Sequence, residues 1–333
     1  MSQETRIRCF VDFEKDGKQI AHLQLPYSSN VSAYGWIGIP IAVIRNGRGP
    51  TLYLGAGNHG DEYEGQIVLA RLIRELDPAA IQGRLIIMPA QNLPAAMAGA
   101  RCSPIDNGNL NRSFPGDPDG PPTAAIAHFI ERVLLPMCDA AVDLHSGGKT
   151  LDYLPSALVR RPPGHDPHAA AKRAALEAFR APIGYMVSDA REDRTLTAAA
   201  DRVGIVAVGT ELGGAGTVTL RTLEVARRGL KNMLRHFGVI EGVPEGPPSR
   251  ITEVKGPDYY VHAPSQGLFE PAFELGDEVE AGQTAGYIHQ IDDPATAPIE
   301  VRFRGAGLVI CKRPILQVER GDCLAHLATD LAG

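Results

Sequence analysis

A histidine and a glutamate with the spacing of metal ligands follow a short apolar segment. Residues 51–62 have the sequence TLYLGAGNHGDE, so His59 and Glu62 come directly after an apolar run that ends in glycines. An imidazole nitrogen and a carboxylate oxygen at this spacing can bind one divalent cation, and a catalytic zinc ion usually has three protein ligands plus water. The stretch therefore predicts two ligands of a metal site.

Two further polar residues follow other apolar segments of the chain. His145 comes after residues 140–144, and Glu211 comes shortly after residues 204–209. Ligands of open α/β sheets bind beyond the carboxyl ends of the strands, so these side chains are expected to meet at one edge of a sheet. Asp143 shares a strand face with His145, and it is placed either to orient that histidine or to act as a buried structural carboxylate.

The predicted ligand set is suited to hydrolysis. Two histidines and a glutamate are a known ligand set for catalytic zinc, which lowers the pKa of a water molecule toward about 7 and polarises a carbonyl group. We therefore expect His59, Glu62 and His145 to bind one zinc ion per chain. Glu211 is then free to accept the proton of the water and return it to the leaving nitrogen.

Each of these residues has a simpler interpretation when it is taken alone. Glu62 would stabilise the first turn of a helix through the helix dipole, His145 would be a partly buried histidine, and Glu211 an ordinary carboxylate at a strand end. Their joint placement after strands favours the metal site. The remaining histidines lack this context, and we expect them to be structural or surface residues: His22, His128, His165, His168, His236, His262, His289 and His326.

A second polar set lies in the long irregular segment at residues 91–122. Loops of this length in a compact domain are usually functional. Arg112 is suited to bind a substrate carboxylate through two hydrogen bonds, with Asn111 adding another. Arg101 would polarise the carbonyl group that is cleaved. The alternative for Arg112 is an ion pair that braces the loop.

The segments around these residues alternate between strand and helix patterns. Strands are expected at residues 51–55, 84–89, 140–144 and 204–209, with a hairpin within 34–46; helices are expected near 62–76, 123–135, 167–180 and 220–237. Thr123 is expected to cap the second of these helices. The alternation predicts an α/β fold with a mixed, mostly parallel sheet and helices on both faces.

The composition changes toward the C-terminus. Residues 241–250 are rich in glycine and proline, and they predict a linker between a catalytic domain at 1–240 and a module at 251–333. Short strands punctuated by glycines predict a small all-β barrel or sandwich. Residues 275–283 resemble a turn of biotinyl/lipoyl-type barrels, but the stretch 288–298 has no carrier lysine, which favours a structural or lid role.

Length and composition restrict the class of protein. The chain has 333 residues, a length that favours two domains. Its hydrophobic content of 44% is typical of a globular protein, and its net charge is −6. The charge argues against a nucleic-acid partner, and no apolar stretch is long enough to span a membrane. Five scattered cysteines without a CxxC motif and an N-terminus without signal-peptide features predict a cytoplasmic protein. Assembly into a homo-oligomer is left open.

Four motifs together resemble one enzyme family. NHGDE at 58–62, NLNR at 109–112, DLH at 143–145 and TELG at 210–213 have the order and approximate spacing of the succinylglutamate desuccinylase/aspartoacylase family. The resemblance runs from about residue 30 to the end of the chain, and it implies a zinc carboxypeptidase-like fold. It also implies these roles: zinc ligands His59, Glu62 and His145, catalytic Glu211, carboxylate-binding Asn111 and Arg112, and carbonyl-polarising Arg101.

The segment after His145 departs from the desuccinylases and aspartoacylases. Those enzymes continue the DLH motif with a Thr- or Asn-containing segment, whereas residues 145–155 here are HSGGKTLDYLP. This segment looks most like the Nα-acetyl-L-2,4-diaminobutyrate deacetylases of ectoine degradation. The resemblance implies that a small N-acetylated amino acid is hydrolysed to acetate and a free amino acid.

Other functions are compatible with the same residues. An aspartoacylase, a succinylglutamate desuccinylase or a carboxypeptidase-type hydrolase would use the same fold and metal site. A non-catalytic protein that binds a metal or another ligand is a rival from a different class. A cationic substrate side chain would need an acidic partner, and the sequence does not choose among Asp189, Glu192 and Asp193.

Overall fold

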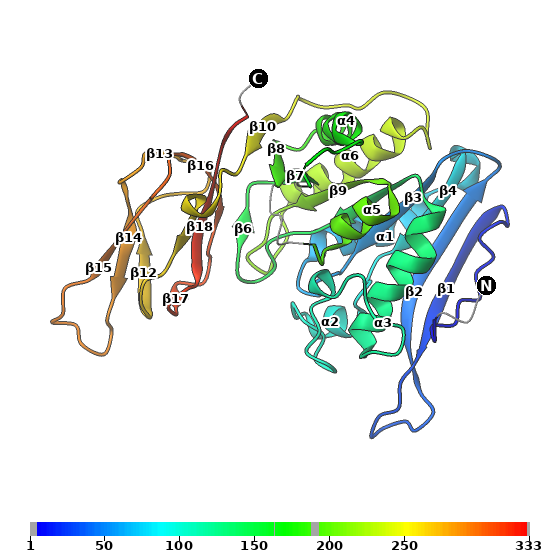
Figure 1. Cartoon of the computed structure of the whole chain (residues 1–333), viewed down its shortest axis with the longest axis horizontal. Coiled ribbons are helices and arrows are strands. Elements are labelled where there is room, and N and C mark those ends of the chain that lie inside the picture. Colours follow the sequence, from blue (N-terminus) through cyan, green and yellow to red (C-terminus); the bar gives the residue numbers. More distant parts are fainter. Residues whose placement is uncertain (1–4, 163, 188–192, 332–333) are drawn as a thin grey trace.

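A large mixed sheet forms the centre of the molecule. The computed structural model describes residues 5–162, 164–187 and 193–331. The main strands of the sheet lie in the order β1-β2-β4-β3-β5-β9-β7-β8-β10-β18-β16-β13, and a separate sheet has the order β15-β14-β12-β17 (Figure 1). This arrangement confirms the predicted mixed α/β fold with additional C-terminal β-structure.

The central strands are mostly parallel. Strands β4, β3, β5 and β9 run parallel to one another, and the hairpin β1–β2 joins β4 in antiparallel pairing. Beyond β9, β7 is antiparallel and β8 is parallel to β7. The bounds are β1 Gly17–Pro26, β2 Trp36–Asn46, β3 Thr51–Ala56, β4 Gly83–Met88, β5 Ala140–Leu144, β7 Ser156–Arg160, β8 Ile183–Val187 and β9 Val206–Glu211.

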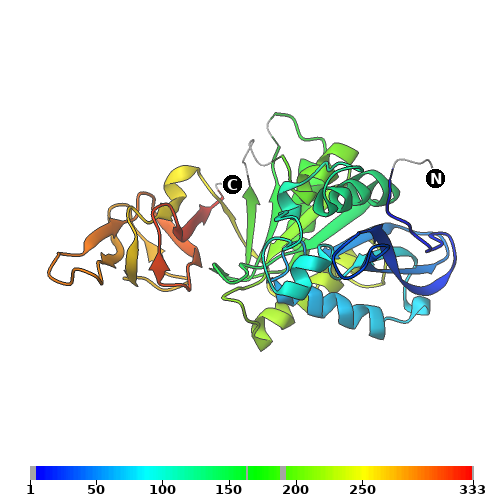
Figure 2. The ribbon, with the colours of Figure 1, turned by 90° about the horizontal axis from the view of Figure 1, so that it is seen from below.

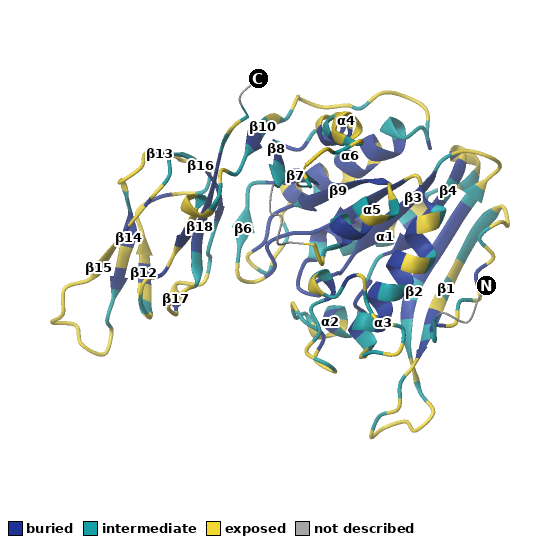
Figure 3. Cartoon of the chain, viewed as in Figure 1, coloured by how far each residue is buried: buried dark blue, intermediate teal, exposed yellow. Residues whose placement is uncertain are grey.

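Two apolar cores cover the two faces of these strands. Leu52 and Leu54 of β3 contribute to one core, while Tyr53 contributes to the other, as the alternation of side chains in a strand requires. Helices α1 (Tyr63–Glu75), α4 (Ala169–Phe179) and α6 (Leu220–His236) cover the first face; α3 (Pro122–Phe129) and α5 (Leu196–Val203) cover the second (Figure 2). Buried residues therefore concentrate along the central strands (Figure 3).

Most expected elements are present, with four differences. The predicted helix at 123–135 consists of α3, a π-helical turn at Ile130–Leu134 and a 3₁₀ turn at Leu135–Met137. The expectation that Thr123 caps this helix is wrong, because Pro121 is the cap residue and Thr123 donates its backbone N–H to Asp106 at 2.7 Å. The expected hairpin within 34–46 is wrong, because Trp36–Asn46 is one continuous strand that pairs with β1. Strands β1, β7 and β8 and helices α2 (Leu93–Ala98) and α5 were not expected from the sequence.

The C-terminal strands extend the large sheet and also form the smaller one. β10 (Arg250–Glu253) pairs in parallel with β8 and antiparallel with β18 (Cys323–Asp330). β11 (Tyr260–His262) also pairs with β18, and β6 (Asp152–Tyr153) pairs with β16. The other bounds are β12 Gly267–Pro271, β13 Glu278–Val279, β14 Thr284–His289, β15 Ile299–Arg302, β16 Gly307–Lys312 and β17 Gln317–Val318.

A third apolar core lies within the C-terminal strands, around side chains such as Phe269, Phe303 and Leu327. The division into a domain at 1–240, a linker at 241–250 and a module at 251–333 stays a prediction.

None of the helices in the described ranges is long and apolar enough to cross a bilayer.

Close packing of α1 against the sheet holds the start of this helix in place. A Cβ atom added at Gly65 would lie 2.6 Å from Cβ of Leu144 and 3.0 Å from Cβ of Ala56. Both neighbouring atoms are attached directly to the backbone, so rotation of a side chain cannot relieve the contact.

We therefore expect Gly65→Ala to lower the free energy of unfolding by about 1–2 kcal/mol, although alanine favours helix. Urea unfolding measures this change. The exposed Arg71→Ala on the same helix is the control, and its effect should stay within about 0.5 kcal/mol. Equal or greater stability of Gly65→Ala would contradict the close packing.

Candidate metal centre

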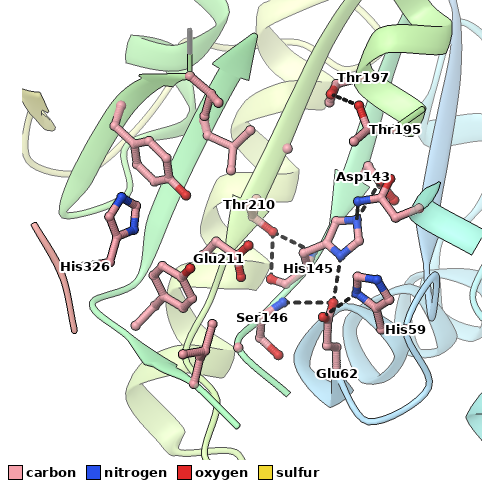
Figure 4. A pocket seen from close by; sticks show the side chains of 18 of the residues that line it. His59, Glu62, Asp143, His145, Ser146, Thr195, Thr197, Thr210, Glu211 and His326 are labelled. Carbon is pink, nitrogen blue, oxygen red and sulfur yellow. Dashed lines mark hydrogen bonds and ion pairs between the residues drawn. The ribbon is translucent and has the colours of Figure 1, made fainter. Parts of the chain in front are cut away.

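The three predicted ligands converge at the carboxyl ends of β3 and β5. His59 lies in the loop after β3, Glu62 is the cap residue of α1, and His145 directly follows β5. All three are buried, and their candidate ligand atoms lie within 4.8 Å of one another. Figure 4 shows both imidazole rings turned toward the Glu62 carboxylate. The structure thus brings together residues that are far apart in the sequence.

Both histidines present the same ring nitrogen to Glu62. Nδ1 of His59 lies 2.6 Å from Oε1 of Glu62, and Nδ1 of His145 lies 2.7 Å from Oε2. The opposite nitrogens contact oxygens that only accept hydrogen bonds: Nε2 of His145 is 2.8 Å from Oδ2 of Asp143, and Nε2 of His59 is 3.1 Å from Oδ1 of Asn109.

This arrangement fits a metal ion. If Nε2 of each ring donates its hydrogen outward, each Nδ1 directs a lone pair at the Glu62 carboxylate. Two lone pairs and a carboxylate at these distances repel one another unless positive charge lies among them. A divalent cation supplies that charge, and outward hydrogen bonds of this kind commonly orient ligand histidines at metal sites.

Asp143 is itself held by neighbouring side chains. Gln91 donates from Nε2 to Oδ1 of Asp143 at 3.1 Å, and Asn58 donates from Nδ2 to Oδ2 at 3.4 Å. All of these groups are buried. Of the two interpretations left open by the sequence, the contact with His145 supports the one in which Asp143 orients this histidine.

The pKa values of Glu62 and His145 are shifted by the charges around them. Burial alone would raise the pKa of Glu62, but the adjacent His59 and His145 outweigh it and lower this pKa well below its usual range. Burial would lower the pKa of His145, whereas Asp143 and Glu62 raise it well above normal. The carboxylate charge of Glu62 is therefore maintained, as metal binding requires.

Glu211 lies at the end of β9 beside this cluster. Its Oε2 atom is buried, and no hydrogen-bond partner for it occurs within the described ranges. Burial raises the pKa of Glu211 to about 8, and Glu62 adds to this effect, while His145 and Arg101 oppose it. Neighbouring backbone contacts fix the position, since Leu212 donates its N–H to the carbonyl of His145 at 3.0 Å.

The three candidate ligands and Glu211 line one pocket, and the remaining predicted residues line it too. Nη1 of Arg101 lies 3.4 Å from Nδ1 of His59 and 3.7 Å from Oε1 of Glu62, and the Arg101 side chain is 45% exposed. Asn111 and Arg112 also line the pocket. All seven candidate residues are therefore placed around one cavity.

The amide of Asn111 has a defined orientation. Its Oδ1 accepts the backbone N–H of Leu196, at the start of α5, at 3.0 Å. Its Nδ2 therefore faces the site, 3.5 Å from Nε2 of His145. Arg112 donates from Nη1 to the carbonyl of Asn111 at 2.8 Å, so the two residues are linked.

Several pocket residues were not expected from the sequence. Asn109 contacts His59 from within the NLNR motif, and its position in that motif was the only available signal. The others come from β6, β7, β8, β11 and β18, and they are Tyr153, Arg160, Tyr185, Tyr260 and His326. His326 was expected to be a structural or surface residue, and this expectation needs correction. The residue is buried, but it lines the pocket, because β10 pairs with both β8 and β18 and so brings β18 close to β8.

Of the acidic residues considered for a cationic side chain, Asp189 and Glu192 lie outside the described residues. Asp193 lines a different surface pocket, next to Phe114 and Arg202.

Comparisons with known proteins point to one family. Residues 48–237 match the model of the succinylglutamate desuccinylase/aspartoacylase catalytic domain. The N-alpha-acetyl-L-2,4-diaminobutyric acid deacetylase of Halomonas elongata is 42% identical over 328 residues, which cover 97% of this chain and 94% of that protein.

Solved structures agree with this match. The succinylglutamate desuccinylase/aspartoacylase of Rhodobacter sphaeroides has a TM-score of 0.92 and 43% identity, covering 98% of this chain and 100% of its own. The product-bound ectoine utilization protein EutE (DoeB) of Ruegeria pomeroyi has a TM-score of 0.95 and 40% identity, with coverages of 98% and 100%.

The contact between Asp143 and His145 leads to a prediction about metal affinity. We expect Asp143→Asn to weaken metal affinity about 10- to 100-fold, because the neutral amide holds the Nε2–H of His145 less strongly. Competition with a chromophoric chelator measures the affinity. The exposed Asp119→Asn is the matched control and should leave it unchanged. Wild-type affinity in Asp143→Asn would mean that Asp143 does not support the site.

Proposed function

The chain belongs to the succinylglutamate desuccinylase/aspartoacylase family, and we propose that it is a zinc-dependent deacetylase of Nα-acetyl-L-2,4-diaminobutyrate in ectoine degradation. The observation that carries this proposal is the pair of Nδ1 atoms directed at one carboxylate, with a partner-free Glu211 oxygen in the same pocket. The named activity of the Halomonas elongata relative supports the choice of substrate.

The donor set is suited to zinc. His59, Glu62 and His145 would hold one ion per chain through two imidazole nitrogens and a carboxylate oxygen. When bound, zinc acts as a Lewis acid on the amide carbonyl and makes water a stronger nucleophile near neutral pH. The surrounding residues supply proton transfer and orientation.

Glu211 is the proposed general base and acid. Its buried Oε2 has no partner among the described residues, so it is available to take a proton from the attacking water. The pKa of Glu211 is raised to about 8, close to the pH of the cytoplasm. A carboxyl group with such a pKa can both take up and release a proton. The protonated carboxyl then gives this proton to the nitrogen of the cleaved amide.

Three polar residues would orient the substrate. Arg112 is proposed to bind the α-carboxylate, and the Nδ2 group of Asn111 would donate a further hydrogen bond to it. The orientation of Asn111 supports this role, because its Oδ1 is already bonded to Leu196. Arg101 lies close enough to His59 and Glu62 to stabilise charge on the carbonyl oxygen during the reaction.

The proposal extends to the context of the enzyme. We infer a cytoplasmic protein with a C-terminal β-module at 251–333, without a nucleic-acid or membrane partner. The nearest alternative substrates are N-acetylaspartate and N-succinylglutamate, which enzymes of the same family hydrolyse. The non-catalytic alternative does not explain why Oε2 of Glu211, beside the candidate metal ligands, has no hydrogen-bond partner among the described residues.

Substrate choice and the role of Glu211 are tested together. We expect the zinc-loaded protein to hydrolyse Nα-acetyl-L-2,4-diaminobutyrate with a higher kcat/KM than N-acetylaspartate or N-succinylglutamate. Glu211→Gln should lower kcat about 10²- to 10⁴-fold and leave the zinc content unchanged, since the amide cannot accept the proton. Release of acetate or succinate and elemental analysis give the two readouts.

The exposed Glu241→Gln serves as the control and should behave like wild type. Activity retained by Glu211→Gln would contradict the assigned base. A wild type that is inactive on all three substrates would contradict the proposed function.

The role of Arg112 predicts a selective loss of affinity. Arg112→Lys should raise KM for the diaminobutyrate substrate about 10- to 100-fold with little change in kcat, because the bidentate contact to the carboxylate is lost. N-acetyl-1,3-diaminopropane lacks that carboxylate, so its kcat/KM should not change. The exposed Arg132→Lys is the control. Equal effects on both substrates would show that Arg112 braces the loop instead.

A further inference from the structure

The pocket beside the metal site has a cationic side and an aromatic side. On the cationic side, Arg101 lies 3.4 Å from His59, and Arg112 lies next to Asn111, whose Nδ2 is 3.5 Å from Nε2 of His145. His326 lies on the opposite side from His59, with Glu211 between them (Figure 4). A substrate that carries a carboxylate and an ammonium group therefore meets different chemistry at the two ends of this pocket.

Four aromatic side chains line the end of the pocket that is farther from His59. We call them the aromatic wall, and they are Tyr153, Tyr185, Tyr260 and His326. The His326 ring stacks on Tyr260, with centroids 4.3 Å apart and planes at 10°. The rings of Tyr153 and Tyr185 meet His326 edge-on, each at 6.3 Å. The wall joins β6 and β8 to the C-terminal strands β11 and β18.

His326 is an unusual member of this wall. Its side chain is only 4% exposed, and neither ring nitrogen has a hydrogen-bond partner among the described residues. Burial lowers the pKa of His326 to about 3, so the ring is neutral and offers one accepting nitrogen. A buried polar group without a partner is costly, which suggests that a ligand completes its hydrogen bonding.

The aromatic end of the pocket is suited to a cation. Glu211 lines the pocket together with Tyr153 and Tyr185, and its carboxyl group favours a cation there when it is ionised. The faces of aromatic rings also attract cations. Arg101 and Arg112 at the other end instead attract the carboxylate.

We propose that the aromatic wall binds the terminal ammonium group of the substrate side chain, with a ring nitrogen of His326 accepting one of its hydrogen bonds. This inference rests on the proposed function and names the part of the site that selects a diaminobutyrate. The α-carboxylate at Arg112 and the ammonium at the wall then fix both ends of the substrate, and the amide is presented to the metal site between them.

The test compares substrates that differ in one charge. Nα-acetyl-L-norvaline has a methyl group where Nα-acetyl-L-2,4-diaminobutyrate has the ammonium group. His326→Phe keeps an aromatic ring and removes the accepting nitrogen. We expect kcat/KM for the diaminobutyrate substrate to fall about 10- to 150-fold, while that for the norvaline substrate changes little.

The outcome that would overturn the proposal is an equal loss on both substrates, which indicates a structural role, or no loss on either. His289→Phe, at a partly exposed histidine on β14, is the matched control and should retain the wild-type preference. Thermal unfolding of both variants shows whether the replacement disturbs the fold.

A binding measurement separates this proposal from the proposed function. Calorimetry with L-2,4-diaminobutyrate and L-norvaline needs no turnover by the holoenzyme. Tighter binding of diaminobutyrate to wild type, with the difference lost in His326→Phe, supports the aromatic wall even if no acetate is released from either acetylated substrate. Equal binding of the two amino acids to wild type overturns it.

Discussion

The candidate site depends on one electrostatic constraint, the placement of the Glu62 carboxylate between the Nδ1 atoms of His59 and His145. Each Nδ1 lies within 2.7 Å of a Glu62 oxygen, and the outer Nε2 atoms face oxygens of Asn109 and Asp143. Such a cluster is stable when positive charge lies inside it. A metal ion provides this charge and also the chemistry that the family membership implies.

The fold imposes this constraint through the register of parallel strands. Leu54 and Gly55 of β3 lie beside Val142 and Asp143 of β5, so the segments that follow them leave the sheet at the same edge. Thr210 of β9 accepts the backbone N–H of His145 at 2.9 Å, which brings Glu211 to this edge. Glu211 and the three candidate metal ligands therefore lie together at this edge of the sheet.

The sequence predicted the elements whose signals are local and missed those that depend on distant partners. Strand β3 and helix α1 have clear periodicity, and the polar residues after the strands indicated the metal site. Strands β7 and β8 are short, and their pairing is long-range. The contact of Asp106 with the backbone N–H of Thr123, and the position of His326, follow from contacts between residues that are separated in the chain.

X-ray absorption at the zinc edge of the purified holoenzyme tests the central claim most directly. The account predicts one zinc ion per chain with a first shell of nitrogen and oxygen only, at about 2.0–2.2 Å, and the outer-shell scattering of two imidazole rings. Replacement of His145 by alanine should remove one of these rings from the spectrum. A sulfur ligand at about 2.3 Å, or a first shell without imidazole, would contradict the assignment of His59, Glu62 and His145.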